Sequence, residues 1–345
     1  FSFYSFFNNV DEDGLIIYGE TAPKPNLTIK KADIKGELNF VNLPDSINDV
    51  TLMVMKESEN LRNTYVLNRG SYDSPTIKVN PGTPQVILPF DYKNNPANRI
   101  GLSKWFFNDN NPLTSRVAVN RIWQQFFGIG IVSTPDDFGS QGSKPINPEL
   151  LDWLAYTYQK EDKWDTKKFI KRIVMSSTYR QSSKIKKESL LIDSDNMYLS
   201  HYPRQKLSAE MIRDNVLASS GMLVNKIGGP SVKPMQPPGL WDEVTGGGGG
   251  SLAFYTPDTG ENLFRRSLYT FWKRTVPPPS MMIFDAPTRD FCVAVRQKTS
   301  TPLQALALMN DPQYLMAAEY LSKKIYEIKN MSKDDKIIKL YRTVT

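Results

Sequence analysis

The chain has 345 residues, of which 43 are Lys or Arg and 36 are Asp or Glu, so its formal net charge is +7 at pH 7. A chain of this length typically forms about two domains and buries a core without disulfides or metals. It has one cysteine, Cys292, and one histidine, His201, which excludes within this chain a disulfide, a Cys-x-x-Cys site, covalent c-type haem and zinc sites with two imidazoles.

Short β-prone runs separated by Pro, Asn, Asp and Gly dominate the first hundred residues. Such runs predict strands, here at residues 27–29, 38–41, 50–55, 65–67 and 77–79. We expect these strands to form a small antiparallel sheet. Turn residues at 85–97 then indicate a linker. We therefore predict a β-rich subdomain at 1–90, a linker at 91–98 and a second domain at 99–345.

From Arg99 onward the apolar residues recur at helical spacing. The pattern predicts helices around 102–106 and 117–127 and at 148–158, 165–177, 207–223, 261–275, 302–309 and 312–328. The predicted fold class is α+β, a mainly α-helical C-terminal domain with a small antiparallel β subdomain on its N-terminal side. No apolar run approaches the roughly 20 residues of a transmembrane helix, so no membrane span is expected.

Residues 227–260 are rich in Pro and Gly and include a run of five glycines at 246–250. No Gly-Lys-Ser/Thr sequence follows this run, so it is not a phosphate-binding loop. The composition indicates either a flexible surface loop or a flap beside a binding site.

Residues 9–20 match the spacing of a calcium-binding loop, in which oxygen ligands recur at fixed positions around a glycine. The predicted ligands are the side chains of Asn9, Asp11, Asp13 and Glu20 and the carbonyl of Leu15. Two prolines, Pro23 and Pro25, exclude the exiting helix of the usual motif. An acidic turn is therefore the alternative to calcium, the one cofactor that the sequence suggests.

Two pairs of polar residues in the first part of the helical domain are candidate ligand-binding groups. Arg116 and Asn120 lie four residues apart on one helix face, where they can bind a ligand or pair within the protein. Asp136 and Asp137 follow a turn, and their adjacent side chains diverge, so that one can cap the turn while the other faces solvent or ligand.

The main basic stretch, residues 265–298, interleaves arginines and lysines with aromatic residues. Arg beside an aromatic ring suits nucleic acid bases and also the carboxylate or sulfate groups of a sugar polymer. We favour an anionic glycan over nucleic acid. The predicted substrate-binding residues of this stretch are Trp272, Arg274, Asp285 and Arg289, which we expect to converge after the proline run at 277–279, with a structural Arg–Asp pair as the alternative.

Several ordered motifs of the helical domain resemble the planctomycete-specific-domain family. They include Asn111-Pro112-Leu113-Thr114-Ser115-Arg116 and Thr134-Pro135-Asp136-Asp137-Phe138-Gly139, and they extend over residues 111–123, 134–139, 148–154, 176–182, 207–210, 228–232, 269–279, 284–287, 301–306 and 310–312. The resemblance covers residues 99–345. Residues 1–90 resemble the end of the domain that precedes it in such proteins.

The resemblance implies a module of unknown function from a large extracytoplasmic protein that usually begins with a cytochrome c domain. Because this chain has no haem attachment motif, any haem must lie elsewhere in the parent protein or in a partner. Family members occur in bacteria that degrade complex, often sulfated, polysaccharides. The first hypothesis is therefore a periplasmic, cell-surface or secreted module for processing an acidic glycan. The alternative is a non-catalytic scaffold that docks the cytochrome domain or another protein.

The two ends of the chain suggest a piece of a longer polypeptide. The sequence opens on Phe1 without an initiator Met or a signal-peptide pattern, and it stops at Thr345 without a helix-capping residue.

Overall fold

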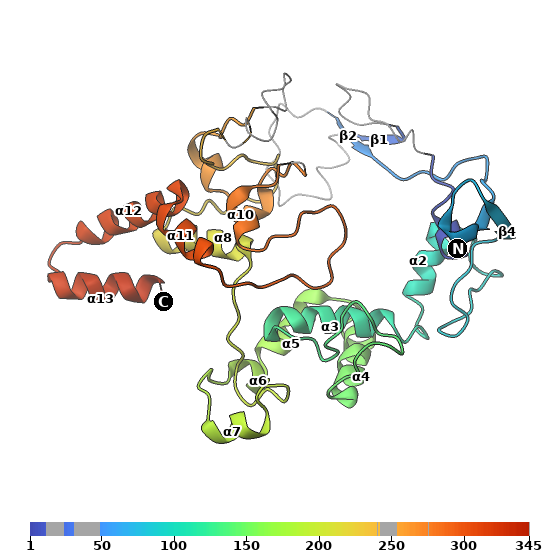
Figure 1. Cartoon of the computed structure of the whole chain (residues 1–345), viewed down its shortest axis with the longest axis horizontal. Helices are drawn as coiled ribbons and strands as arrows, with labels where there is room; N and C mark the ends of the chain where they lie inside the picture. Colours follow the sequence, from blue (N-terminus) through green and yellow to red (C-terminus); the bar gives the residue numbers. More distant parts are fainter. Residues whose placement is uncertain (12–23, 31–48, 240, 242–253, 275, 345) are drawn as a thin grey trace. The chain divides into compact units, whose positions relative to one another are not determined.

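The computed structural model describes residues 1–11, 24–30, 49–239, 241, 254–274 and 276–344 (Figure 1). The chain forms two compact units, unit 1 at Phe1–Pro203 and unit 2 at Arg204–Thr345. Each unit has a hydrophobic core of its own. The arrangement is α+β and mainly helical, with its β-sheets near the N-terminus, so the predicted fold class is confirmed.

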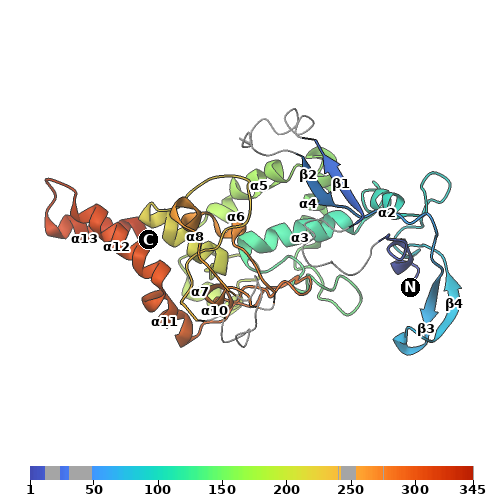
Figure 2. The ribbon, with the colours of Figure 1, turned by 90° about the horizontal axis from the view of Figure 1, so that it is seen from above.

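Unit 1 begins with four short strands that form two separate antiparallel sheets of two strands each. The strands are β1 (Asn26–Ile29), β2 (Val50–Met53), β3 (Thr64–Leu67) and β4 (Pro75–Val79), with β1 paired to β2 and β3 paired to β4 (Figure 2). Four of the predicted strands are thus present, and the fifth, at 38–41, lies outside the described residues. We had expected one small sheet, but the apolar pattern predicts strands and does not specify their partners.

The residues just before the predicted linker at 91–98 pack against the helix that follows it, α2 (Arg99–Phe106). Trp105 donates its indole N–H to the carbonyl oxygen of Leu88 at 2.7 Å. Phe90 is buried and its ring lies 5.3 Å from that of Phe6. The side chain of Asn98 caps α2 by accepting the N–H groups of residues 100 and 101, as expected of an Asn at this position.

The helical core of unit 1 lies between α3 and the helices that follow it. They are α3 (Thr114–Phe127), α4 (Pro148–Tyr156), α5 (Thr166–Val174), α6 (Ser177–Arg180) and α7 (Lys187–Ile192). Val119 and Phe169 are fully buried in this core. Gly128 ends α3 with a φ of 83°, a conformation that costs glycine little.

A turn of π-helix, η3 (Thr157–Glu161), follows α4 and ends just before Asp162, whose carboxylate forms two ion pairs. The Asp162 side chain is fully buried, and its Oδ1 lies 2.9 Å from Arg172 Nη2 and 3.2 Å from Lys168 Nζ. Lys163 and Trp164 both have positive φ values, 49° and 64°, which are uncommon for such residues. The ion pairs hold the chain through this strained turn, and they outweigh burial in lowering the pKa of Asp162.

Unit 2 is built around α8 (Ala209–Ser220), which packs on a helical hairpin. The other helices are α10 (Pro279–Ile283), α11 (Pro302–Asn310), α12 (Pro312–Tyr326) and α13 (Lys333–Val344). Thr301 and Gln304 form a capping box at the start of α11, and Asp311 caps α12. The hydrophobic core of unit 2 includes Met281, Phe284 and Tyr314.

The helix predicted at 261–275 is wrong. Residues 260–264 and 267–269 form short 3-10 turns, and residues 265 and 270 form parallel bridges to residues 224 and 232. The reason is a buried guanidinium on α8: Arg213 donates to the carbonyl oxygens of Arg265 and Leu263, both at 2.8 Å, and to Gln313 Oε1 at 2.9 Å. Carbonyls held by side chains in this way do not serve a helix.

Two smaller observations complete the fold. Among the described residues, no helix is both long and apolar enough to cross a bilayer. Cys292 is exposed, although an unpaired cysteine is typically a small buried residue. Its loop, residues 286–300, contains no helix or strand.

Candidate functional site

The candidate site of unit 2 is organised by an extended segment, residues 270–273, which follows a 3-10 turn at 267–269. Val232 N donates to Tyr269 O at 2.8 Å, and Phe271 N donates to Val232 O at 2.7 Å. Successive side chains of extended backbone point to opposite sides. Phe271 and Trp272 therefore enter two different aromatic clusters.

The first cluster, here the Trp241 cluster, consists of three rings and two lysines. The Trp241 ring lies 5.0 Å from the ring of Tyr255 and is stacked at 6.4 Å on that of Phe271. Lys273 Nζ lies 4.6 Å from the centre of the Trp241 ring, and Lys233 Nζ lies 5.4 Å from that of Phe271. Both distances are within the range of cation–π attraction.

A cavity of about 390 Å³ adjoins this cluster. Its described lining residues are Gln236, Pro237, Pro238, Gly239, Trp241, Phe254, Tyr255, Thr256 and Pro257. The Trp241 indole donates to Gln236 Oε1 at 3.1 Å, and the Tyr255 hydroxyl donates to Pro234 O at 2.6 Å. Burial, with Asp258 nearby, raises the pKa of Tyr255, so this hydroxyl stays a hydrogen-bond donor at neutral pH.

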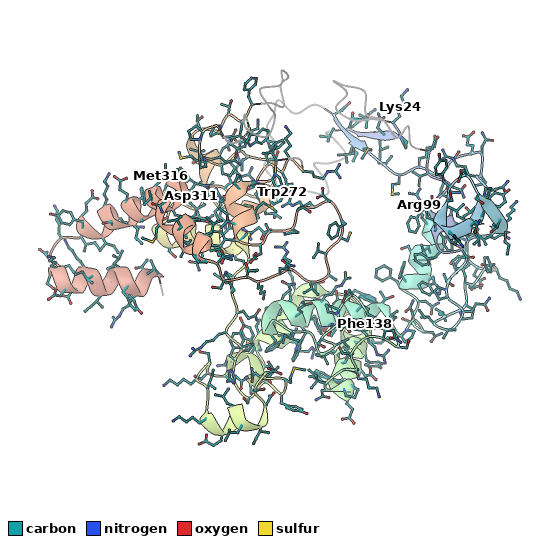
Figure 3. The ribbon with its side chains drawn as sticks, viewed as in Figure 1. Lys24, Arg99, Phe138, Trp272, Asp311 and Met316 are labelled. Carbon is teal, nitrogen blue, oxygen red and sulfur yellow. The ribbon has the colours of Figure 1, made fainter. Side chains whose placement is uncertain are left out.

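The second cluster, here the Trp272 cluster, pairs Trp272 with Arg289 (Trp272 is labelled in Figure 3). The guanidinium carbon lies 4.3 Å from the centre of the indole ring, and the indole N–H donates to Thr288 O at 3.0 Å. Arg289 is exposed with a φ of 67°. A left-handed arginine is held at a cost, so the turn is fixed in place rather than adopted by default.

Asp285 anchors the loop that carries Arg289. Its carboxylate accepts the backbone N–H of Thr299 at 2.7 Å and the Thr299 hydroxyl at 2.8 Å. These hydrogen bonds, with Lys206 and Gln304 nearby, outweigh burial and lower the pKa of Asp285. Asp285 and Arg289 therefore serve different contacts and do not form the Arg–Asp pair weighed as the structural alternative.

Arg274, the fourth predicted residue of this stretch, is exposed in the turn after Lys273. The structure thus joins Trp272 directly to Arg289 and links Asp285 to them through the loop backbone. Rings for stacking beside exposed guanidinium groups can bind a planar or cyclic ligand that carries negative charge.

The other predicted pair of basic and amide residues lies in unit 1 and has internal partners. Arg116 Nε donates to Asp152 Oδ1 at 2.7 Å and its Nη1 to Pro112 O. Asn120 is fully buried, donating to Val132 O at 3.0 Å and accepting Val132 N at 2.8 Å. Both side chains thus pair within the protein, which was the alternative to ligand binding for these two residues.

The adjacent carboxylates also separate as their spacing suggested. Asp137 Oδ1 accepts Gly139 N at 2.7 Å and so holds the turn. Asp136 is exposed. Their side chains serve different surroundings, and the role of Asp136 toward a ligand stays a prediction.

Only part of the predicted calcium loop falls among the described residues. Asn9 Oδ1 accepts the backbone N–H of Arg62 at 2.7 Å, and Asp11 is exposed. Asp13, Leu15 and Glu20 lie outside the described residues. In the ranges that the structure describes, no group of three or more His, Cys, Asp or Glu residues could hold a metal ion, and the calcium site stays a prediction.

Sequence reasoning missed Lys233, Trp241 and Tyr255. All three lie in the Pro- and Gly-rich stretch at 227–260, which we interpreted as a loop or flap. The available signal was the presence of a tryptophan and a tyrosine in a proline-rich segment, since large aromatic residues in such segments often pack onto a neighbouring surface. Their partner, residues 270–273, could not be identified while that segment was expected to be helical.

Comparison with known proteins places the chain in one family. No curated protein and no solved structure matches the chain. The model of PSD1, described as a protein of unknown function (DUF1553), matches residues 98–345. This match covers most of the chain and both the Trp241 and Trp272 clusters. The chain therefore belongs to the PSD1 family.

Proposed function

We propose that unit 2 is a binding module for acidic oligosaccharides, with the Trp241 and Trp272 clusters as its binding surface. The observation that carries the proposal is that Phe271 and Trp272, on opposite sides of one extended segment, enter two clusters in which a cationic side chain lies beside an aromatic ring. The cavity of about 390 Å³ beside Trp241 provides space for a ligand.

The physical basis is that aromatic rings and charged side chains recognise different parts of an acidic sugar. A pyranose ring stacks on an indole through its C–H groups, while a neighbouring guanidinium binds carboxylate or sulfate through two parallel hydrogen bonds. Arg289 is exposed, so its N–H groups remain accessible to such an anion while its carbon atom lies over Trp272. A neutral sugar would gain only the stacking part.

In the wider proposal, the chain is a module of an extracytoplasmic protein linked to the processing of complex, sulfated or acidic polysaccharides. Any haem-linked oxidative chemistry would be carried by other domains. This context is supported by the family resemblance and by the basic, aromatic character of residues 265–298. Calcium at residues 9–20 would be a structural ion of the same protein.

Isothermal titration calorimetry with a sulfated galactan oligosaccharide tests the proposal, with the desulfated oligosaccharide as the matched control ligand. We expect saturable binding of the sulfated form that weakens about tenfold in Arg289→Gln and Arg274→Ala. Arg342→Gln removes an exposed arginine of α13 and should leave the affinity unchanged. Equal binding of both oligosaccharides, or equal losses in all three variants, would refute the proposal.

The scaffold alternative is favoured by a separate observation on α11. Leu303, Leu306 and Met309 are 55%, 56% and 70% exposed. An exposed apolar helix face of this kind is typical of a docking surface. Retention of a purified cytochrome c domain from the parent protein by the chain, lost in Leu306→Glu, would support this alternative.

A further inference from the structure

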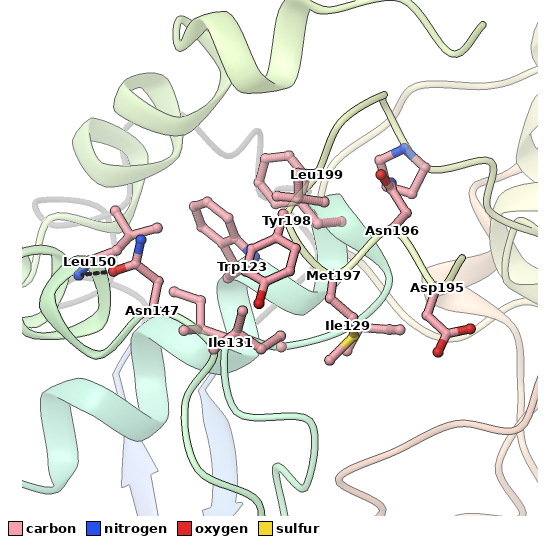
Figure 4. Close-up of a pocket in the computed structure, with 14 residues that line it drawn as sticks. Trp123, Ile129, Ile131, Asn147, Leu150, Asp195, Asn196, Met197, Tyr198 and Leu199 are labelled. Atoms are coloured by element: carbon pink, nitrogen blue, oxygen red, sulfur yellow. Dashed lines mark hydrogen bonds between the residues drawn. The ribbon is translucent and has the colours of Figure 1, made fainter. Parts of the chain in front are cut away.

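Unit 1 contains an apolar pocket that no predicted site residue lines (Figure 4). Its volume is about 170 Å³. Its walls come from the end of α3 and the residues after it, from the start of α4 and the residues before it, and from the loop at 195–203. The described lining residues are Trp123, Phe127, Ile129, Gly130, Ile131, Ile146, Asn147, Leu150, Asp195, Asn196, Met197, Tyr198, Leu199 and Pro203.

The loop that closes one wall is built rather than loose. Asp193 accepts the backbone N–H groups of Met197 at 2.7 Å and Tyr198 at 2.8 Å. Asn196 donates its amide to His201 O at 2.9 Å. Asn196 and Leu199 have positive φ values of 54° and 53°, and such strain persists only where surrounding contacts fix the backbone. The pocket is therefore formed before any ligand arrives, as is usual for binding sites.

The charge of the pocket is opposite to that of the chain. None of its described lining residues is Lys, Arg or His, although the chain as a whole carries a net charge of +7. The one carboxylate is that of Asp195, which lies at one end beside Ile129 and Met197, whereas Asn147 lies at the other end (Figure 4). In the described part of the chain, no side chain pairs with the Asp195 carboxylate.

The aromatic rings of the pocket also have no cation over them among the residues that the structure describes. Arg172 lies over Trp153 elsewhere in unit 1. Among the described residues, however, no Lys or Arg lies over Trp123, Phe127 or Tyr198. Trp123 and Phe127 pack against each other with ring centres 4.2 Å apart. Electron-rich ring faces and a carboxylate within one pocket both attract a positive group.

We propose that this pocket binds an organic ammonium ion whose hydrocarbon part is about the size of a benzene ring. An apolar cavity of about 150 Å³ accommodates benzene, so the hydrocarbon part fits a pocket of about 170 Å³. The ammonium group would lie toward Asp195 and be attracted by the carboxylate and the ring faces together. An anion is disfavoured because none of the described lining residues is positively charged. The site is independent of the saccharide site proposed for unit 2.

Calorimetry and ligand-observed NMR on the full chain test this proposal with three probes of similar shape: benzylammonium, benzyl alcohol and benzoate. We expect benzylammonium to bind with a Kd on the order of 1 mM, as suits a ligand of this size. Benzyl alcohol should bind about tenfold more weakly, and benzoate should show no binding. Equal binding of benzoate and benzylammonium would overturn the proposal.

Two variants separate the charge from the cavity. Asp195→Asn changes an exposed side chain without altering its shape, and it should weaken benzylammonium about tenfold while leaving benzyl alcohol unchanged. Ile129→Trp should fill the pocket and abolish binding of both, and because Ile129 is 47% exposed the variant should fold. Asp290→Asn, an exposed carboxylate of unit 2, is the matched control and should change nothing. Unaltered benzylammonium binding in either pocket variant would assign the binding to another surface.

Discussion

The aromatic clusters of unit 2 and the aromatic pocket of unit 1 contain the same kinds of residue in opposite electrostatic settings. In unit 2, Lys273 lies over Trp241 and Arg289 lies over Trp272. The rings of Trp123 and Tyr198 share their pocket with an aspartate and, in the part of the chain that the structure describes, have no cation over them. The chain's own charges thus occupy one set of rings and leave the other open.

This difference shows that aromatic residues do not by themselves define a ligand class. A ring already covered by a guanidinium lies beside the outer N–H groups of that arginine, which favour an anion. A ring beside a lone carboxylate offers an attractive face to a cation. The neighbouring charge therefore decides which sign of ligand each region can bind.

The largest effect that sharpens the comparison is expected from Arg213→Met. Arg213 is buried and holds the backbone on which the unit 2 clusters are built. Removing it leaves the carbonyls of Leu263 and Arg265 without their donor, which should lower the free energy of unfolding by about 3–5 kcal/mol. Hydrogen exchange measured by mass spectrometry should show that backbone amides at 263–272 lose protection, whereas those of unit 1 keep theirs.

The control for this prediction is Arg213→Lys. It keeps the positive charge but loses the planar fork that reaches several acceptors, so its destabilisation should be intermediate. A variant Arg213→Met with the stability of the parent chain would mean that the bridges to residues 224 and 232 hold the segment without the guanidinium.

The sequence predicted those elements whose signals are local. The helices expected at 148–158, 207–223 and 312–328 are present as α4, α8 and α12, and four short β-prone runs form strands. The turn at Asp137 and the internal pairing of Arg116 were also stated as alternatives from local spacing. The helices, the strands and the Asp137 turn depend on residues within a few positions of one another, whereas the partner of Arg116, Asp152, lies on another helix.

The remainder depends on contacts between distant residues. The segment at 261–275 has helical apolar spacing, yet Arg213, some 50 positions away, captures its carbonyls. The unit 1 pocket joins the end of α3 to residues 146–150 and 195–203, and its loop is shaped by left-handed residues that no periodicity indicates. Pairing in space, rather than residue type, was the missing information.

In unit 1, we expect Asp162→Asn to lower the free energy of unfolding by less than Arg213→Met does. The two cations that pair with Asp162, Arg172 and Lys168, are partly exposed, so water can solvate them when the carboxylate is lost. Loss of the buried carboxylate should reduce the free energy of unfolding by on the order of 3 kcal/mol. Because the folded pKa of Asp162 is lowered, its contribution is complete above the ordinary aspartate value of about 3.9 and is lost as the pH falls through the folded pKa.

Urea unfolding between pH 7 and pH 2 checks this prediction. The parent chain should lose stability with acid more steeply below pH 4 than Asp162→Asn does, because the variant lacks the titrating group. Benzylammonium binding at pH 7 should persist in the variant, since Asp162 does not line the pocket. Identical acid limbs in the two proteins would show that Asp162 does not contribute to the pH dependence.

The smallest effect on stability is expected from removing the guanidinium that lies over Trp272. This change directly tests the difference between rings that have a cation over them and rings that do not. An exposed cation–π pair contributes about 0.5–1 kcal/mol, so Arg289→Gln should lower the free energy of unfolding by no more than that. A double-mutant cycle with Trp272→Leu isolates the pair, and the coupling should be of the same size because the guanidinium lies 4.3 Å from the ring centre. A second cycle between Arg289→Gln and Phe271→Leu is the matched control and should show no coupling, since Phe271 has Lys233 over its ring instead. If Arg289 couples equally to both rings, the arginine acts through the general charge of the segment, and the distinction between occupied and open rings would not explain the ligand preferences of the two units.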